Sequence, residues 1–178
     1  NGEILKKIKR RDLERLLSRL KRIKPEGIAV SFLHSYKNPG NENKAAQYLS
    51  ALGVPVSVSS RLLPEFREYE RTSTIVANAY LLPNVKSYMG ALSVRFSSRG
   101  GGGHRISVMQ SSGGVTTPEQ AGDEPVRILL SGPAGGVVGA FNISRLTGYG
   151  KVITYDMGGT STDVALCDGG LRFSTETS

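Results

Sequence analysis

"VITYDMGGTSTDVAL", residues 152–166, changes character halfway through. Four residues typical of a buried strand lead into Asp156, a glycine pair, three hydroxyl side chains and a second acid, after which the apolar pattern resumes. Glycine can take backbone angles closed to other residues and lets a ligand approach the main chain closely. Consecutive N–H groups around such a turn can form an anion cradle. The stretch therefore predicts two strands joined by a turn that suits a phosphate group.

The turn supplies the residues of a candidate phosphate site, in which hydroxyl donors add to the peptide N–H groups. These residues are Gly158, Gly159, Thr160, Ser161 and Thr162. The acid at the strand end, Asp156, can hold a magnesium ion through water, because magnesium keeps most of its hydration shell beside nucleotide phosphates. The alternative is a tight β-hairpin in which glycines satisfy the turn and threonines cap the strands. The turn alone does not decide between the two interpretations.

A helix rich in small residues is predicted just upstream, at residues 134–147. Its small residues are Ala134, Gly135, Gly136, Gly139 and Ala140. Pairs of them stand one helical turn apart, so that one side of the helix can admit another helix at close range. Each glycine costs a soluble helix about 1 kcal/mol relative to alanine, so several together indicate a packing reason.

The rest of the chain alternates predicted helices and strands. In order, we expect a helix within 1–24, a strand at 27–33, a helix at 43–52, a strand at 54–60, a long helical region at 63–92 with a kink or break at Pro83, a flexible glycine loop at 97–104, strands at 105–114 and 126–132, and a helix at 133–146 beginning with Pro133. This order predicts a layered α/β fold with a mixed, mostly parallel sheet and flanking helices.

Bulk properties limit the classes of protein that remain. With 178 residues, 38% of them hydrophobic, the chain can bury a core and is expected to hold one domain, or one plus part of another. No stretch approaches the ~20 apolar residues of a membrane helix, and the first residues do not form a signal peptide. The single cysteine, Cys167, has no second cysteine to pair with, which excludes a disulfide within the chain, and its apolar strand pattern predicts a buried thiol. We therefore expect a cytoplasmic protein with no membrane partner.

The formal charge of +8 is concentrated at one end of the chain. Ten of the 23 basic residues fall within residues 1–24, and the remainder of the chain is nearly neutral. Leucines recur there at helical spacing while arginines take other faces, which predicts a basic amphipathic helix with a solvated polar side. No aromatic residues interleave the basic ones and no nucleic-acid module follows, so a nucleic-acid partner is not expected.

The small-residue helix, strand, Asp-x-Gly-Gly-Thr turn and second strand resemble the actin, hexokinase and heat-shock chaperone ATPase superfamily. In that superfamily the helix connects two lobes and the turn is the second phosphate loop. More narrowly, "LHSYKNP", "LPEFREYERTSTIVANAYL", "VMQSSGG", "SGPAGGVVGA" and "DMGGTSTDVAL" together resemble the hydantoinase and oxoprolinase family. This family includes 5-oxoprolinases, N-methylhydantoinases and the ATP-dependent acetone and acetophenone carboxylases. The resemblance spans nearly the whole chain.

The resemblance also implies a domain organisation with incomplete, ribonuclease-H-like or actin-like lobes. The basic helix occupies 1–24, the C-terminal part of the first lobe occupies 25–147 and ends in the connecting helix 134–147, and the second lobe begins at 148–178. The family's first phosphate loop and adenosine-binding segment have no counterpart here, so we expect an internal fragment that is inactive alone and binds ATP weakly. The intact protein is expected to form a homo-oligomer or to bind a partner subunit.

The activity implied by the resemblance is ATP-dependent opening of a cyclic amide or imide, of the 5-oxoproline or hydantoin type, after phosphorylation of its carbonyl oxygen. ATP and Mg²⁺ are the implied cofactors. Carried onto this chain, Gly158, Gly159 and Thr160 would hold phosphate oxygens, Asp156 would orient hydrated magnesium, and Thr162 or Asp163 would support the turn. The family's carboxylases activate a ketone by related phosphoryl transfer.

Other motif residues are weaker candidates for contact with substrate or phosphate. They are Arg71 and the strand-end residues Ser111, Ser112, Gly113 and Gly114. Arg71 lies among alternating charges that ordinary surface pairs on a helix explain equally well.

Two further positions bear on the motifs. His34 is expected to be a hydrogen-bonded structural residue, because no partner acid is identifiable. Ser112 and Asn41 depart from the family pattern, which usually has asparagine and histidine at these two positions.

Three other functions remain open from sequence alone. An ATP-dependent carboxylase subunit is the nearest alternative, and a noncatalytic scaffold that binds a partner with its lobe comes from a different class. A nucleic-acid binder that uses the basic helix would show a steep salt dependence of binding. The sequence does not identify the catalytic residues of any of these.

Overall fold

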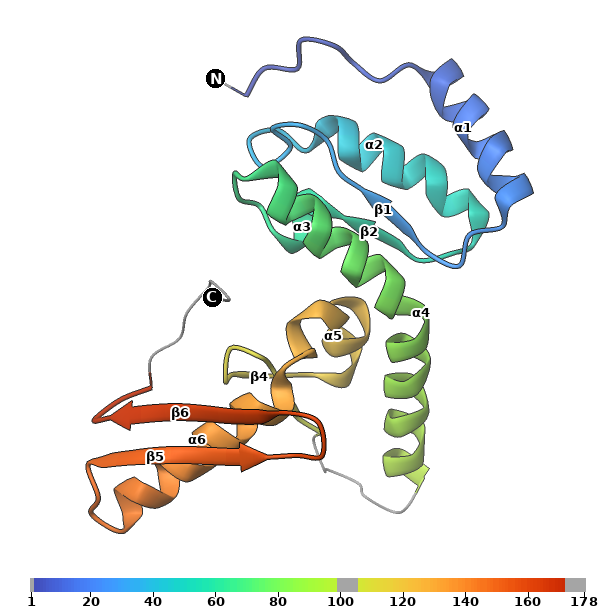
Figure 1. The fold of residues 1–178 in the computed structure, drawn as a ribbon. Helices are drawn as coiled ribbons and strands as arrows, with labels where there is room; N and C mark the ends of the chain where they lie inside the picture. Colours follow the sequence, from blue (N-terminus) through green and yellow to red (C-terminus); the bar gives the residue numbers. More distant parts are fainter. Residues whose placement is uncertain (1, 99–105, 172–178) are drawn as a thin grey trace.

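The computed structural model describes residues 2–98 and 106–171. Its N-terminal half is a small parallel sheet covered by helices (Figure 1). Strands β1 (Ile28–Val30) and β2 (Val56–Val58) pair in parallel, with Ile28 opposite Val56. Helix α2 (Gly40–Leu49) and the 3₁₀ turn η1 (Ser50–Leu52) join the two strands. Two neighbouring parallel strands need such a crossover, because the chain must return to the starting end of the first strand before the second can begin.

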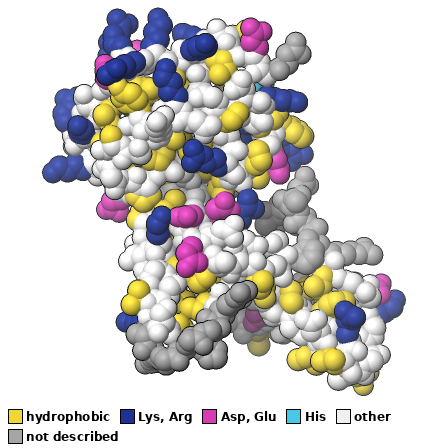
Figure 2. Space-filling model, turned by 180° about the vertical axis from the view of Figure 1, so that it is seen from behind, with side chains coloured by type: hydrophobic (Ala, Val, Ile, Leu, Met, Phe, Trp, Pro, Cys, Tyr) yellow, Lys and Arg dark blue, Asp and Glu magenta, His cyan; other side chains and the backbone are white. Residues whose placement is uncertain are grey.

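Helix α1 (Arg10–Ile23) packs its leucine side onto α2 and β1. The buried residues of this core are Leu13, Val30, Ala45 and Leu49, with Leu17 and Leu20 partly buried against them. The polar side of α1 is exposed, and Figure 2 shows Lys and Arg side chains gathered on this part of the surface. The predicted basic amphipathic helix is therefore confirmed.

Helix α3 (Ser59–Leu62) leads to the long helix α4 (Glu68–Ser98), which continues through Pro83 instead of breaking there. Figure 1 shows α4 changing direction part-way along its length. Proline has no N–H to donate to the carbonyl four residues earlier, which is that of Ala79. A Cβ built on Gly27 would lie 2.6 Å from this oxygen, so the backbone before β1 packs directly against it. Glycine at position 27 is what permits the contact.

The C-terminal half contains two antiparallel pairs of strands. The short strands β3 (Val108–Met109) and β4 (Val115–Thr116) form one pair, followed by helix α5 (Pro118–Asp123) and the 3₁₀ turn η2 (Pro125–Ile128). Helix α6 (Ser131–Leu146) then leads to strands β5 (Lys151–Met157) and β6 (Thr162–Asp168).

The α/β class is confirmed, but the strand arrangement differs from the expected sheet. In the described part of the chain the strands form three two-stranded sheets, and only β1 and β2 are parallel. The tight turn at 158–161 brings the chain straight back beside β5, and such a connection makes neighbouring strands antiparallel.

The strand predicted at 126–132 is wrong. Residues 125–128 form η2, and α6 already begins at Ser131, two residues before the predicted start. The apolar run did not decide the local structure, because polar groups hold its backbone: Val126 donates its N–H to Asn78 Oδ1 at 3.1 Å. Short apolar runs cannot be assigned by periodicity alone.

Other predicted boundaries shift by a few residues. The strand expected at 54–60 ends at Val58, and the one at 105–114 is reduced to Val108–Met109. Of the expected glycine loop, residues 99–104 lie outside the described residues. None of the helices in the described ranges is long and apolar enough to cross a membrane. Cys167 is a buried free thiol, as predicted.

Candidate functional site

A cleft of about 510 Å³ lies between α6 and the hairpin of β5 and β6. One wall is the N-terminal half of α6, from Pro133 to Ala140, together with Ser111. The other wall is the end of the hairpin nearest its turn, residues 154–156 and 163–165. In Figure 1 the hairpin lies across α6 in the lower part of the molecule. The predicted small-residue helix and the strand ends beside the predicted Asp-x-Gly-Gly-Thr turn are thus neighbours in space.

The small residues of α6 admit strands, not the second helix that the sequence suggested. A Cβ built on Gly136 would stand 3.7 Å from Asp156 Oδ2, and one on Gly135 would stand 3.6 Å from Met109 Cγ. Both are ordinary contacts, so alanine would fit at either position. A Cβ built on Gly139 would meet no atom within 4 Å. Packing within the described chain therefore does not account for this run of glycines.

Asp156 and Asp163 are directly opposite each other across the hairpin, and both line the cleft. Residues paired in this way project to the same face of a sheet, and two like charges there destabilise the pair. A divalent cation held through water would remove that repulsion. The described residues contain no group of three or more acidic, histidine or cysteine ligands, so a cation here would keep waters or phosphate oxygens as its other ligands. This donor set fits magnesium.

Asp163 was predicted only to support the turn, and its place beside Asp156 was missed. The signal was present in the spacing, because a hairpin whose turn spans 158–161 puts positions 156 and 163 in register. The face they share becomes more polar toward the turn. It begins with the pair Val152 and Cys167 and ends with the two acids.

The glycines of the turn do not use the special backbone angles expected of them. Gly158 and Gly159 both lack a positive φ, and the Gly158 N–H donates to the Ser161 carbonyl at 2.9 Å. A Cβ on Gly159 would meet no atom within 4 Å. The fold of the described residues does not require glycine at 159, and the space beside its main chain is open.

The candidates at 111–114 divide into one cleft residue and a turn. Ser111 lines the cleft, where its N–H donates to the Arg127 carbonyl at 2.7 Å and its hydroxyl accepts the Leu130 N–H at 3.1 Å. The residues after it form the turn between β3 and β4, in which Gly113 has a φ of 78°. Ser112 and Gly114 are exposed.

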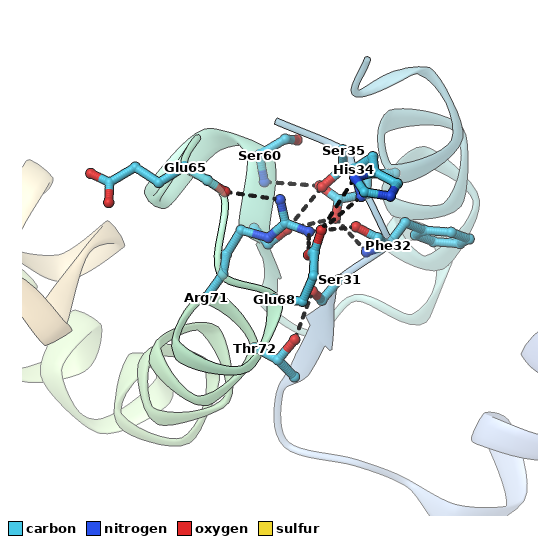
Figure 3. Close-up of polar contacts among 11 residues, drawn as sticks. Ser31, Phe32, His34, Ser35, Ser60, Glu65, Glu68, Arg71 and Thr72 are labelled. Carbon is cyan, nitrogen blue, oxygen red and sulfur yellow. Dashed lines mark hydrogen bonds and ion pairs between the residues drawn. The ribbon is translucent and has the colours of Figure 1, made fainter. Parts of the chain in front are cut away.

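Arg71 lies in the N-terminal half, 0% exposed, at the start of α4 (Figure 3). Its guanidinium donates to the Phe32 carbonyl at 2.6 Å and the Glu65 carbonyl at 3.2 Å, and it pairs with Glu68. The Tyr36 ring is 5.6 Å away. The structure thus gives Arg71 partners within its own chain and does not bring it to the cleft lining.

His34 has the acidic partner that the sequence did not reveal. Its backbone N–H donates to Glu68 Oε1 at 3.0 Å, and its Nδ1 lies 3.8 Å from the same oxygen. The residue adopts a φ of 55°, in the left-handed region where asparagine, aspartate and histidine are the residues other than glycine that occur most often. Arg71 pairs with the other carboxylate oxygen of Glu68, so a buried cation fixes the group that accepts the His34 N–H.

Glu42 is a buried charged residue that the sequence analysis did not predict. Its carboxylate is 0% exposed and accepts the Phe32 N–H at 2.7 Å, the Ser59 hydroxyl at 2.6 Å and the Ser60 N–H at 2.9 Å. Burial alone raises its pKa, but the hydrogen bonds from Ser59, Ser60 and Phe32 outweigh burial and hold the pKa of Glu42 below its usual value. Its sequence position contained a signal, since it shares the buried face of α2 with Ala45, Ala46 and Leu49.

Sequence comparison gives the family context of this geometry. The chain matches the hydantoinase/oxoprolinase N-terminal region over residues 1–53 and the hydantoinase/oxoprolinase family over residues 71–178. A 5-oxoprolinase of Saccharomyces cerevisiae is 36% identical over 187 residues, covering 99% of this chain and 14% of the relative.

Two solved structures share the fold. The ATP-dependent caprolactamase of Pseudomonas jessenii superposes with a TM-score of 0.82 at 30% identity, over 93% of this chain and 24% of the other. A nucleotide-free structure of acetone carboxylase, studied for ATP-dependent acetone carboxylation, gives a TM-score of 0.79 at 33% identity, over 92% and 24%. The chain therefore spans about a quarter or less of the proteins that it matches.

Proposed function

Because this chain belongs to the hydantoinase/oxoprolinase family, we propose that it is part of an ATP-dependent hydrolase that opens a cyclic amide or imide of the 5-oxoproline or hydantoin type. The observation that carries the proposal is the acidic pair Asp156 and Asp163, which faces the glycine side of α6 across the cleft. The names of the relatives add support, since they include 5-oxoprolinase and an ATP-dependent caprolactamase.

Each group of the hairpin has a role in this proposal. The main chain at Gly158 and Gly159, with the hydroxyls of Thr160, Ser161 and Thr162, would hold phosphate oxygens. Asp156 would orient hydrated Mg²⁺, and Asp163 would share that charge from the opposite strand. Bound ATP would supply the phosphoryl group that activates the substrate carbonyl, and the chain's part is to position it and balance its charge. Ser111 remains a candidate phosphate or substrate contact.

The remaining features of the sequence analysis enter as predictions. The lobes are those of an actin-like ATPase, with the boundaries given above and α6 connecting them, and the setting is cytoplasmic. Two relatives are named as subunits, the caprolactamase subunit alpha and the acetone carboxylase beta subunit. We therefore propose that the protein works with a partner subunit.

A carboxylase is the second candidate, favoured by the match to acetone carboxylase. Turnover by the full-length protein separates the two. We expect ATP consumption to be stimulated by 5-oxoproline or hydantoin, with ring-opened product, and not by acetone plus bicarbonate. Stimulation by the ketone alone would assign the carboxylase reaction. Absence of ATP consumption with either class would support a noncatalytic scaffold.

A further inference from the structure

The wall of the cleft that carries Ser111 is held by the segment 127–130. The Ser111 N–H donates to the Arg127 carbonyl at 2.7 Å, and its hydroxyl accepts the Leu130 N–H at 3.1 Å. One cleft residue is therefore bonded to both ends of the segment 127–130, which leads directly into α6. Any movement of this segment moves Ser111 and the first turn of α6 together.

The Arg127 side chain connects that segment to the N-terminal half of the molecule. Its Nη2 donates to the Leu62 carbonyl at 2.8 Å, at the end of α3, and its Nε pairs with Glu124. The guanidinium is partly exposed, with 45% of the side chain accessible. Arg127 thus holds Ser111 through its carbonyl and α3 through its side chain.

A second anchor acts on the preceding residue. Asn78, buried in α4, accepts the Val126 N–H on Oδ1 at 3.1 Å. Its Nδ2 donates to Ser57 Oγ at 2.8 Å and to the Asp123 carbonyl at 3.4 Å. The backbone at 126 is therefore held by α4 and, through Asn78, by β2. The side chain of Arg127 adds a contact from the next residue to α3.

We infer that Arg127 is a positioning residue for the nucleotide cleft, an inference that rests on the proposed function. Its side chain bonds to Leu62 and Glu124 and to none of the hairpin residues predicted to hold phosphate or metal. It acts by setting where Ser111 and the first turn of α6 stand opposite Asp156. Loss of its side chain leaves the Leu62 carbonyl without this donor and frees the segment 127–130 to shift, and a misplaced wall weakens ligand binding without removing a reacting group.

The test uses the full-length protein with the variants Arg127→Gln and Arg127→Lys. Arg145→Gln is the matched control, because this arginine lies in the last turn of α6 and its guanidinium stands over the Phe141 ring, away from the cleft lining. We expect Arg127→Gln to raise KM for MgATP about tenfold, the scale of one charge-assisted hydrogen bond, and to leave kcat nearly unchanged. Arg127→Lys regains part of the loss, because an ammonium group still reaches a carbonyl. The control keeps the parent KM.

Coupling to Ser111 distinguishes positioning from general destabilisation. Ser111→Ala removes the acceptor for the Leu130 N–H, and its effect on KM should not add to that of Arg127→Gln, because both act on one segment. Should Arg127→Gln fail to fold, Arg127→Lys with and without Ser111→Ala gives the same comparison.

Three results overturn the inference: an unchanged KM in Arg127→Gln, a fall in kcat alone, or full additivity with Ser111→Ala. An enzyme that consumes ATP normally with an unchanged KM in Arg127→Gln refutes only this inference. A parent protein that never binds ATP refutes the proposed function and, with it, the role of Arg127.

Discussion

The two halves of the molecule place charged and apolar side chains differently. Around β1 and β2, the charged side chains of Glu42 and Arg71 are fully buried and hydrogen-bonded to the backbone. On the outer face of the β5–β6 hairpin, apolar side chains remain 60% to 70% exposed. These are Ile153, Tyr155, Met157, Val164 and Leu166. The inner face of the same hairpin carries the acidic pair. Buried charge in one half fixes the backbone, whereas acids lining a cleft in the other half are available to a ligand.

The largest expected effect on stability comes from breaking the buried carboxylate of the first half. Glu42→Gln replaces an acceptor of three hydrogen bonds by an amide that presents N–H groups to some of those donors. We expect the free energy of unfolding to fall by about 3 kcal/mol. Urea unfolding of the full-length protein measures it. Glu14→Gln, at an exposed carboxylate paired with Arg10, is the control and should leave the midpoint unchanged.

Gly27→Ala is expected to have the next largest effect. The added methyl would stand 2.6 Å from the Ala79 carbonyl oxygen, which belongs to the backbone and cannot rotate away. Relief requires β1 and α4 to separate, at a cost of about 2 kcal/mol. The contrasting variant is Gly90→Ala, in the helix α4 that also contains Ala79, where the added methyl meets no atom within 4 Å. A thermal shift of equal sign in both variants would contradict the close approach of Gly27 to α4.

The pH dependence of stability sharpens the assignment of Glu42. Its pKa is lowered in the folded protein, so its stabilising contribution is complete above the unfolded value of about 4.3 and is lost as pH falls through the folded pKa. The difference in unfolding free energy between the parent and Glu42→Gln should therefore be constant at neutral pH and shrink below about pH 4.3. A difference that grows on acidification would mean that Glu42 is protonated in the folded state at neutral pH.

The smallest expected effect separates glycines needed for packing from glycines that leave space for a ligand. Gly136→Ala and Gly139→Ala each gain helix propensity of up to about 1 kcal/mol, and neither methyl meets a close neighbour. Only the methyl at 136 points to the Asp156 carboxylate, 3.7 Å away. We expect both variants to melt at or above the parent temperature, and only Gly136→Ala to weaken magnesium-dependent ATP binding. Equal binding by the two variants would contradict a ligand on this side of α6.

Local sequence patterns predicted several elements correctly, whereas contacts between distant segments decided the rest. Helical periodicity located α1 and α2, the glycine turn between apolar stretches located the hairpin, and Pro133 with the small residues located α6, because each follows a local rule. It failed at 126–132, where the tertiary bond from Val126 to Asn78 decides the backbone. The phosphate-loop residues remain predictions, whereas Asp163 could have been placed beside Asp156 by counting through the turn. The links from His34 to Glu68 and from Glu42 to Ser59 join segments far apart in sequence, and no local pattern encodes them.

The most direct test of the cleft is calorimetry of ATP binding to the full-length protein, with and without magnesium, for the parent, Asp156→Ala, Asp163→Ala and Asp168→Ala. Asp168 lies on β6, as Asp163 does, and pairs with Lys151 outside the cleft lining, which makes it the matched control. We predict that the variants at 156 and 163 lose the magnesium dependence while staying folded, and that the control behaves as the parent does. Unaltered magnesium-dependent binding by Asp156→Ala would contradict the account, because the turn would then be a hairpin without a nucleotide.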